Sequence, residues 1–389
     1  MTRAANLREE LDRIAADENL IKDLEILPKN YTFEVPKTIW KIRSTKSKVV
    51  ALQLPEGLLL YACVLSDILV KYTDCEIIIM ADVTYGACCV DDYTAKALGC
   101  DLLVHYGHSC LVPIQDTVGI HMLYIFVNIN VNLSHFIDSI EKNFPKDKSI
   151  GFVSTVQFLT SLHAAKNELN KHGFNVFIPQ CSPLSPGEVL GCTSPKLPDH
   201  TDMLVYLGDG RFHLESAMIQ NPTVPAYQYN PYNRTLTHEE YAFNLMVKNR
   251  RLAVEALRNS ETVGLIQGTL GRQGNLKIFE NLEEKLKQRG KKFLRVLLSE
   301  IFVAKLACFD DVQSWVQVAC PRLSIDWGTM FERPLLTPYE MAAALDYVEF
   351  NEQDYPMDFY AYDSRGPWTN NHETYRPQRP KRTHITVKN

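Results

Sequence analysis

The chain has 389 residues, of which 46% are apolar and 22% are charged, a composition that excludes a fibrous or wholly disordered protein. Its formal net charge of −5 gives no global electrostatic footprint for nucleic-acid binding. The charged first segment excludes a secretory signal, and the most apolar run, from Gly57, is too short to span a bilayer. We therefore expect a cytoplasmic protein with no membrane contact and no direct nucleic-acid binding.

Along the chain, the first predicted element is a short helix over residues 4–20, within an N-terminal extension of residues 1–46. A strand–helix–strand pattern then occurs three times, with first strands that begin at Val49, Ile150 and Val263, 101 and 113 residues apart. Repetition of this order implies parallel sheets with right-handed crossovers. The sequence therefore predicts an α/β fold of three similar parallel-sheet domains. The predicted domains cover residues 47–148, 149–260 and 261–345.

The composition changes after the third repeat. The chain becomes rich in aromatic residues, Pro and Asn, and we assign residues 346–389 to a C-terminal extension. The extension finishes in the basic sequence RPQRPKRTHITVKN, for which we expect disorder.

Three of the ten cysteines lie in turn-rich segments that follow predicted strands, one in each repeat: Cys88, Cys192 and Cys320. Functional loops of such folds lie at the carboxyl ends of the strands, so the three thiols can converge if the repeats pack around a common axis. Three thiolates that leave a fourth position open fit a catalytic iron–sulfur cluster better than a disulfide or a structural zinc ion. Cys89 competes with Cys88, and Cys181 competes with Cys192. Local reasoning favours Cys88 and Cys192 without deciding either pair.

The remaining candidates are less specific. Four other cysteines are predicted to be packing residues: Cys63, Cys75, Cys100 and Cys308. A histidine-containing segment after a strand could line a polar pocket, although a structural role is an equal alternative. A glycine-rich loop before a helix could hold a carboxylate or a ribose, and its arginine could clamp an amino-acid carboxylate. We assign these residues to a cofactor-binding pocket: His105, His108, Ser109, Gly271, Arg272 and Gln273.

Several motifs occur together and in order: LQLPEGLLLYA, YGACCVDD, PLSPGEVLGC, GRQGN, VACPRLSIDWG and YPMDFYA. Over nearly its whole length the chain resembles the family of subunit 1 of 2-(3-amino-3-carboxypropyl)histidine synthase, which begins diphthamide biosynthesis. The resemblance implies three α/β domains around a pseudo-threefold axis. It also implies a central 4Fe–4S cluster held by Cys88, Cys192 and Cys320, which selects among the competing thiols.

The same resemblance implies a transferase. A reduced cluster would cleave the Cγ–S bond of S-adenosylmethionine in a non-classical radical reaction. The 3-amino-3-carboxypropyl group would then be added to C2 of a histidine in translation elongation factor 2. The implied partners are a paralogous second subunit in a heterodimer, the elongation factor as protein substrate, and a small metal-binding electron donor with its reductase.

Two other functions are compatible with the same layout. A quinolinate-synthase-like dehydratase also combines three repeats with a three-cysteine 4Fe–4S cluster, but the aromatic and basic extensions of this chain favour a protein partner. A non-catalytic partner subunit would have no need for three thiolates around an open iron. The three loop cysteines therefore favour the transferase.

Overall fold

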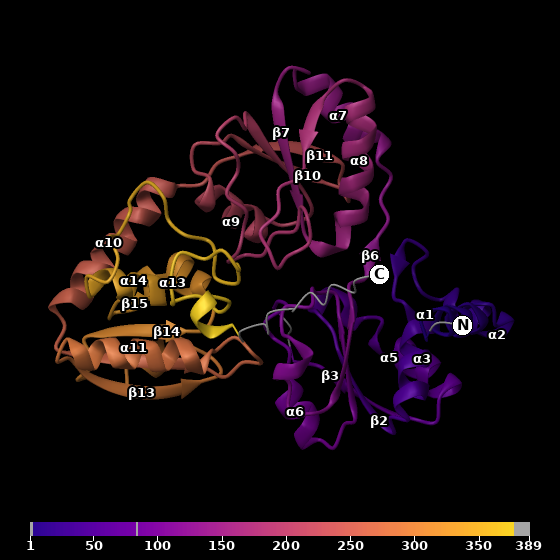
Figure 1. Ribbon diagram of the computed structural model, residues 1–389, viewed down its shortest axis with the longest axis horizontal. Coiled ribbons are helices and arrows are strands. Elements are labelled where there is room, and N and C mark those ends of the chain that lie inside the picture. The colour runs from indigo at the N-terminus through magenta and orange to yellow at the C-terminus, as the bar shows by residue number, and fades with distance from the viewer. Residues whose placement is uncertain (1–2, 83–84, 377–389) are drawn as a thin grey trace, which may run out of the picture.

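The structure is a computed structural model that describes residues 3–82 and 85–376, and it has three lobes, each built on its own sheet (Figure 1). The predicted basic tail lies outside the described residues from residue 377 onwards. Within the described ranges, no helix combines the length and the apolar character needed to cross a lipid bilayer.

The first sheet has four parallel strands in the order β3-β2-β4-β5. Its central strand β4 is buried along its full length, as expected for a parallel strand covered on both faces. The strands are β2 (Val49–Gln53), β3 (Glu76–Met80), β4 (Leu102–Tyr106) and β5 (His121–Ile125). The helical segments of this lobe are α4 (Glu56–Leu59), α5 (Ala62–Tyr72), α6 (Asp92–Ala97) and the 3-10 turn η1 (Ile114–Asp116).

The single helix predicted over residues 4–20 is divided between two helices in the structure. The break falls at Asp17, whose side chain caps the second helix by accepting from the backbone N–H groups of Asn19 and Leu20. These flanking elements are α1 (Arg3–Ala15), α2 (Glu18–Leu24), β1 (Tyr31–Thr32) and α3 (Val35–Thr45). Strand β1 pairs with β6 (Asn128–Ile129), which leads out of the first lobe.

The second sheet has five strands in the order β11-β10-β9-β7-β8, of which only β11 is antiparallel to its neighbour. The strands are β7 (Ser149–Ser154), β8 (Asn175–Phe177), β9 (Met203–Leu207), β10 (Ala226–Asn230) and β11 (Thr235–Glu239). The helical segments are α7 (Ser134–Asn143), η2 (Val156–Phe158), α8 (Leu159–Lys171), α9 (Phe212–Gln220) and α10 (Phe243–Asn259).

The third sheet is again fully parallel, in the order β13-β12-β14-β15. The strands are β12 (Thr262–Gly268), β13 (Lys292–Leu298), β14 (Ser314–Val318) and β15 (Leu335–Leu336). The helical segments are α11 (Leu276–Gln288), α12 (Val303–Leu306), α13 (Pro321–Trp327), η3 (Gly328–Met330), α14 (Pro338–Ala344) and η4 (Glu373–Tyr375). In all three sheets the first strand of the repeat lies between the second and the third, so the predicted α/β fold with parallel sheets is confirmed.

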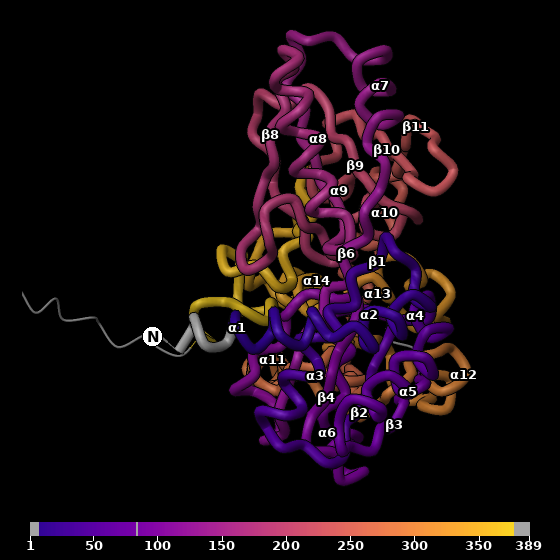
Figure 2. The backbone as a smooth tube through the Cα atoms, turned by 90° about the vertical axis from the view of Figure 1, so that its right-hand side faces the viewer, coloured from indigo at the N-terminus to yellow at the C-terminus, as the bar shows by residue number. Residues whose placement is uncertain are grey.

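The C-terminal extension packs back onto the molecule as far as it is described. Figure 2 shows this yellow segment between the lobe of the second sheet and the two lower lobes. Its apolar side chains are buried, among them Met357, Phe359, Tyr360 and Trp368. The extension is therefore part of the folded body up to about η4, and it brings aromatic side chains to the region where the lobes meet.

Candidate metal centre

The three predicted cysteines lie in loops of three different sheets. Cys88 lies between β3 and α6, and Cys192 lies between β8 and β9. Cys320 lies two residues after the end of β14 and is the N-cap residue of α13. The loops do not occupy equivalent positions, because two of them follow the second strand of their repeat and the third follows the third strand. The repeat thus brings the loops to one region without making them copies of one another.

The thiols are close enough to affect one another's ionisation. The pKa of Cys88 is raised well above its ordinary value by a hydrogen bond with the neighbouring Cys89 side chain and by burial, and the Cys320 and Cys192 thiols raise it further. Burial and then Cys320 raise the pKa of Cys192 to about 12. Because like charges shift a pKa only at short range, the sulfur atoms of three sheets lie near one point.

The thiols are not gathered as they would be around one ion. Within residues 3–82 and 85–376, no group of three or more His, Cys, Asp or Glu side chains has the spacing of a single-metal site. Ligands of one zinc ion lie about 2.3 Å from the metal and therefore crowd within roughly 4 Å of each other. The irons of an iron–sulfur cluster are held by cysteine thiolates, the donor type that these three loops supply.

Cys89 is held by its own set of contacts. Its side chain is 2% exposed, its carbonyl accepts a hydrogen bond from Gln53 Nε2 at 2.8 Å, and its Sγ accepts from Gln273 Nε2 at 3.5 Å. Gly271 has φ +53°, and a Cβ there would lie 2.6 Å from the Cys89 carbonyl carbon, so only glycine fits. Cys88 is less buried than Cys89 and, like Cys192, packs against the apolar cluster of the third sheet.

The loop of Cys192 is shaped by close packing. A Cβ on Gly191 would clash with the ring of Phe212, so the backbone can approach that ring only with glycine at this position. Cys181, the competing thiol, has its pKa raised to about 12 by burial and by Asp358 and Asp363, with no contribution from the other cluster candidates. Its neighbours are carboxylates, not thiols.

An arginine that the sequence analysis missed ties two of the loops together. Arg322 follows Cys320 by two residues and is 2% exposed. It donates to the carbonyl of Gly191 at 3.2 Å and to that of Phe212 at 2.6 Å, and it pairs with Glu215 at 2.5 Å. The helix that begins at Cys320 is thereby fixed against the Cys192 loop. The ACPR motif contains this residue, but its partners lie more than a hundred positions away.

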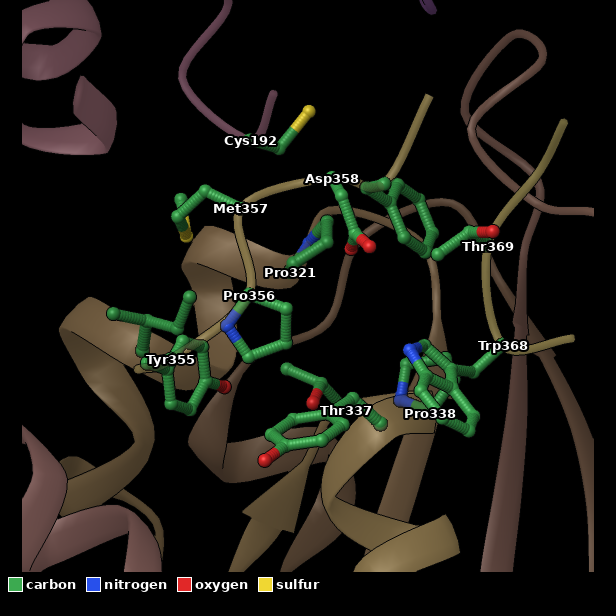
Figure 3. Close-up of a pocket in the computed structure, with 13 residues that line it drawn as sticks. Cys192, Pro321, Thr337, Pro338, Tyr355, Pro356, Met357, Asp358, Trp368 and Thr369 are labelled. Atoms are coloured by element: carbon green, nitrogen blue, oxygen red, sulfur yellow. The ribbon is translucent and has the colours of Figure 1, made fainter. Parts of the chain in front are cut away.

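Figure 3 shows the small pocket beside this loop, with the Cys192 sulfur above the chain of Met357 and Asp358. The pocket is lined mainly by Pro, aromatic and other apolar side chains. Burial raises the pKa of Asp358, whose carboxylate accepts from the Arg365 backbone N–H at 2.8 Å. The surroundings of Cys192 are therefore mainly apolar, and such an environment keeps water from a metal centre.

Histidines surround the first-sheet side of the site. His105 is fully buried, with Nδ1 2.9 Å from Gln53 Oε1 and with no partner for Nε2 within the described chain. His108 Nδ1 is also buried and without a partner among the described residues. Burial lowers the pKa of His108 to about 4, and burial lowers that of the nearby His213 to about 4 as well. The imidazoles are neutral at pH 7. His213 was not predicted.

Ser109, another predicted pocket residue, has a structural partner. Ser109 donates a hydrogen bond to Glu188, which is 1% exposed and also accepts from the Ser185 backbone N–H at 3.0 Å. Burial raises the pKa of Glu188. The contact joins a loop of the first sheet to the loop that precedes Cys192, so Ser109 connects lobes.

Arg272, the predicted carboxylate clamp, has a carboxylate partner within the chain. The Arg272 guanidinium makes a two-pronged ion pair with the buried Asp92, at 2.7 and 2.6 Å, and stacks 4.1 Å from the ring centroid of Tyr93. Its backbone N–H donates to the Cys88 carbonyl at 2.9 Å. Arg272 therefore ties the third sheet to the Cys88 loop, and its charge is already neutralised by Asp92.

The cysteines predicted to be packing residues divide evenly. Cys75 and Cys100 are buried, as expected, but Cys63 and Cys308 are exposed, so the prediction is wrong for these two. Helix α5 buries Leu65, Ile68 and Leu69, and Cys63 falls outside that face.

Comparison with known proteins gives a consistent result. The family described as "Putative diphthamide synthesis protein" matches residues 54–356. The chain is 63% identical over 391 residues to 2-(3-amino-3-carboxypropyl)histidine synthase subunit 1 of Caenorhabditis elegans, covering 100% of this chain and 98% of that protein. It is 55% identical over 361 residues to the Homo sapiens protein of the same name, covering 92% and 82%. The crystal structure of Dph2 from Pyrococcus horikoshii with a 4Fe–4S cluster is similar with a TM-score of 0.68 and 26% identity, covering 83% of this chain and 93% of that one.

Proposed function

The chain belongs to the 2-(3-amino-3-carboxypropyl)histidine synthase subunit 1 family of diphthamide synthesis proteins, and we propose that it is the subunit that holds the catalytic cluster. Its reaction is the transfer of a 3-amino-3-carboxypropyl group from S-adenosylmethionine to C2 of a histidine in translation elongation factor 2. The observation that carries this proposal is the convergence of thiols from three separate sheets, in a chain similar to a Dph2 that contains a 4Fe–4S cluster.

Three residues would hold the cluster: Cys88, Cys192 and Cys320. The donor set fits the group, since it consists of sulfur alone, comes from three loops and leaves one iron without a protein ligand. We also propose that the three lobes are domains of residues 47–148, 149–260 and 261–345 related by a pseudo-threefold axis. The shared strand order of the three sheets supports this arrangement, although the cysteine loops depart from the symmetry.

When bound and reduced, the cluster would supply one electron that breaks the Cγ–S bond of S-adenosylmethionine, releasing methylthioadenosine and a 3-amino-3-carboxypropyl radical. The protein's part is to hold Cγ, and not the 5′ carbon, beside the open iron. At the substrate histidine, a carbon–carbon bond replaces the C2 hydrogen, which leaves as a proton and an electron, so the transfer is redox-neutral overall.

Side chains around the thiols support this role. His108 keeps a buried ring nitrogen without a partner among the described residues, and we assign it to the amino-acid end of S-adenosylmethionine. His105 Nδ1 bonds to Gln53 and Gln273 Nε2 bonds to Cys89, and through these contacts both residues would hold the first loop in place. Gly271 would allow the third-sheet loop to approach the backbone of Cys89. Arg322 fixes the Cys192 loop against α13.

The partners follow from the family. We propose that a paralogous second subunit completes a heterodimer, that a small metal-binding electron donor with its reductase reduces the cluster, and that the protein works in the cytoplasm. The subunit number in the names of the relatives supports a multi-subunit enzyme.

The test uses the chain purified anaerobically with its paralogue and reconstituted with iron and sulfide. After chemical reduction it is mixed with S-adenosylmethionine and unmodified elongation factor 2. Methylthioadenosine and a modified histidine are expected, and both should be lost in Cys320→Ala but kept in the exposed-site control Cys308→Ala. Release of 5′-deoxyadenosine, or unchanged release of methylthioadenosine by Cys320→Ala, would contradict the proposal. If the chain is a non-catalytic subunit, the wild type and Cys320→Ala will form the same amount of product.

A further inference from the structure

The C-terminal segment, residues 355–371, lies directly on the loop that carries a predicted cluster ligand. The Phe359 backbone N–H donates to the Cys192 carbonyl at 3.3 Å. The next backbone N–H, that of Tyr360, donates to Thr193 Oγ1 at 3.0 Å. Because both contacts use the backbone, they fix the path of the segment and therefore the direction in which its side chains leave it.

The same segment is anchored on the third sheet. The Asn370 backbone N–H donates to the Phe359 carbonyl at 2.9 Å, which closes the segment on itself. Asn275, the N-cap residue of α11, donates to Asn370 Oδ1 at 2.9 Å. The Tyr360 carbonyl accepts from Asn371 Nδ2 at 2.7 Å. The segment thus joins the loop of the second sheet to a helix of the third, with Tyr360 at its centre.

The Tyr360 side chain is directed into the thiol region. It is 7% exposed and packs in the apolar cluster that Cys88 and Cys192 also contact. Burial raises the pKa of its phenol well above 10, and the thiols of Cys88, Cys192 and Cys320 raise it further, so the ring lies near all three. Its hydroxyl makes no hydrogen bond within residues 3–82 and 85–376, whereas its backbone N–H and carbonyl are both bonded.

A tyrosine hydroxyl is a hydrogen-bond donor, and one with no partner among the described residues is available to a ligand. The acceptors that the site offers are the sulfur atoms of its cysteines and of the cluster they would hold. Hydrogen bonds to these sulfur atoms stabilise the more negative, reduced cluster and raise its reduction potential. Residue 360 lies beyond the family match, which ends at residue 356.

We propose that Tyr360 is a positioning residue of the metal centre, whose hydroxyl donates a hydrogen bond to a sulfur atom of the bound cluster and thereby raises its reduction potential. This inference rests on the proposed function, since it requires that Cys88, Cys192 and Cys320 hold a 4Fe–4S cluster. It assigns the C-terminal segment a part in tuning electron transfer to S-adenosylmethionine.

The experiment compares the wild type with Tyr360→Phe, which keeps the packed ring and removes the hydroxyl. The matched control is Tyr362→Phe, in the same segment but 37% exposed. Each chain is reconstituted anaerobically, its iron is counted, and its midpoint potential is measured by a redox titration followed by electron paramagnetic resonance. Tyr360→Phe should keep its iron and show a more negative midpoint potential than the wild type and the control.

An unchanged midpoint potential in Tyr360→Phe would overturn the inference while leaving the proposed function intact. Loss of iron from Tyr360→Phe would also overturn it, because the hydroxyl would then be needed to retain the cluster and not to tune it. A wild-type chain that holds no 4Fe–4S cluster would overturn the inference and the proposed function together.

Discussion

The two ends of the chain pack on the three lobes in different ways. The N-terminal flank, through α1 to α3, covers one face of the first sheet, where Ile39 and Ile42 are buried against Val50. None of the three predicted ligand cysteines belongs to that apolar cluster. The C-terminal segment instead bonds to the Cys192 loop and faces the thiols. One flank therefore stabilises a lobe, and the other completes the centre between lobes.

The largest effect should come from the centre. Cys320→Ala removes one thiol without disturbing a sheet, so methylthioadenosine release should fall by more than roughly 100-fold. The unfolding midpoint of the cluster-free protein should hardly change. Chromatographic measurement of methylthioadenosine and thermal unfolding of the same preparation check both points. A large loss of stability in the cluster-free variant would mean that the centre and the scaffold are not separable.

The N-terminal flank should behave in the opposite way. Ile39→Ala opens a cavity in a fully buried position and should lower the free energy of unfolding by about 2–5 kcal/mol. Because this residue is remote from the thiol cluster in the contact network, the iron content per folded chain should stay at the wild-type value. Denaturant titration and iron analysis test this, and reduced iron in the folded fraction would break the comparison.

Low pH should destabilise the fold through the buried histidines beside the thiols. The pKa values of His108 and His213 lie at about 4 in the folded protein, below the ordinary value of 6.5. The unfolded chain therefore binds more protons between these values, and stability should be lost as the pH falls from about 6.5 towards 4. His213→Asn should weaken this pH dependence in thermal unfolding of the cluster-free protein. A slope equal to that of the wild type would show that the titration arises elsewhere.

A smaller effect is expected where the C-terminal segment meets the third sheet. Asn275→Ala removes both the N-cap of α11 and the hydrogen bond to Asn370, and should cost about 1 kcal/mol of stability. Asn275→Asp keeps the cap but loses the donor, so its difference from the wild type isolates the contact with the segment, and its difference from Asn275→Ala isolates the cap. Faster loss of iron in air from both variants is the expected sign that the segment shields the centre. If the wild type and the variants lose iron at the same rate, the C-terminal segment does not shield the centre.

The smallest effect is expected at an exposed thiol. Cys63→Ala should change stability by less than about 0.5 kcal/mol and leave iron content and product release unchanged, since its side chain is exposed on α5. This variant serves as the baseline for every cysteine substitution above.

Much of the fold could be predicted because its signals are local. Buried parallel strands are continuous apolar runs, so the strands that begin at Val49 and Val263 were found directly. The turn-rich loops around Cys88 and Cys320 were equally visible. The ion pair of Arg272 with Asp92 could not be predicted because Asp92 is 180 positions away, on α6 of the first lobe.

The C-terminal segment could not be read in the same way. It has no helical or strand period, and its structure depends on contacts such as that of Tyr360 with Thr193, which exist only after two sheets have formed. Its aromatic composition suggested contact with a partner protein. In the structure, several of these aromatic side chains are buried against the chain's own lobes. Similarly, only the folded centre reveals His213 beside His108.

The central claim is that three thiols from three sheets hold one cluster, and its most direct test is the iron and sulfide content of the anaerobically reconstituted chain. The account predicts about four iron atoms per wild-type chain and a 4Fe–4S signal on reduction, with both nearly absent in Cys88→Ala, Cys192→Ala and Cys320→Ala. Full iron content in any one of these three variants, or its loss in Cys89→Ala instead of Cys88→Ala, would contradict the assignment.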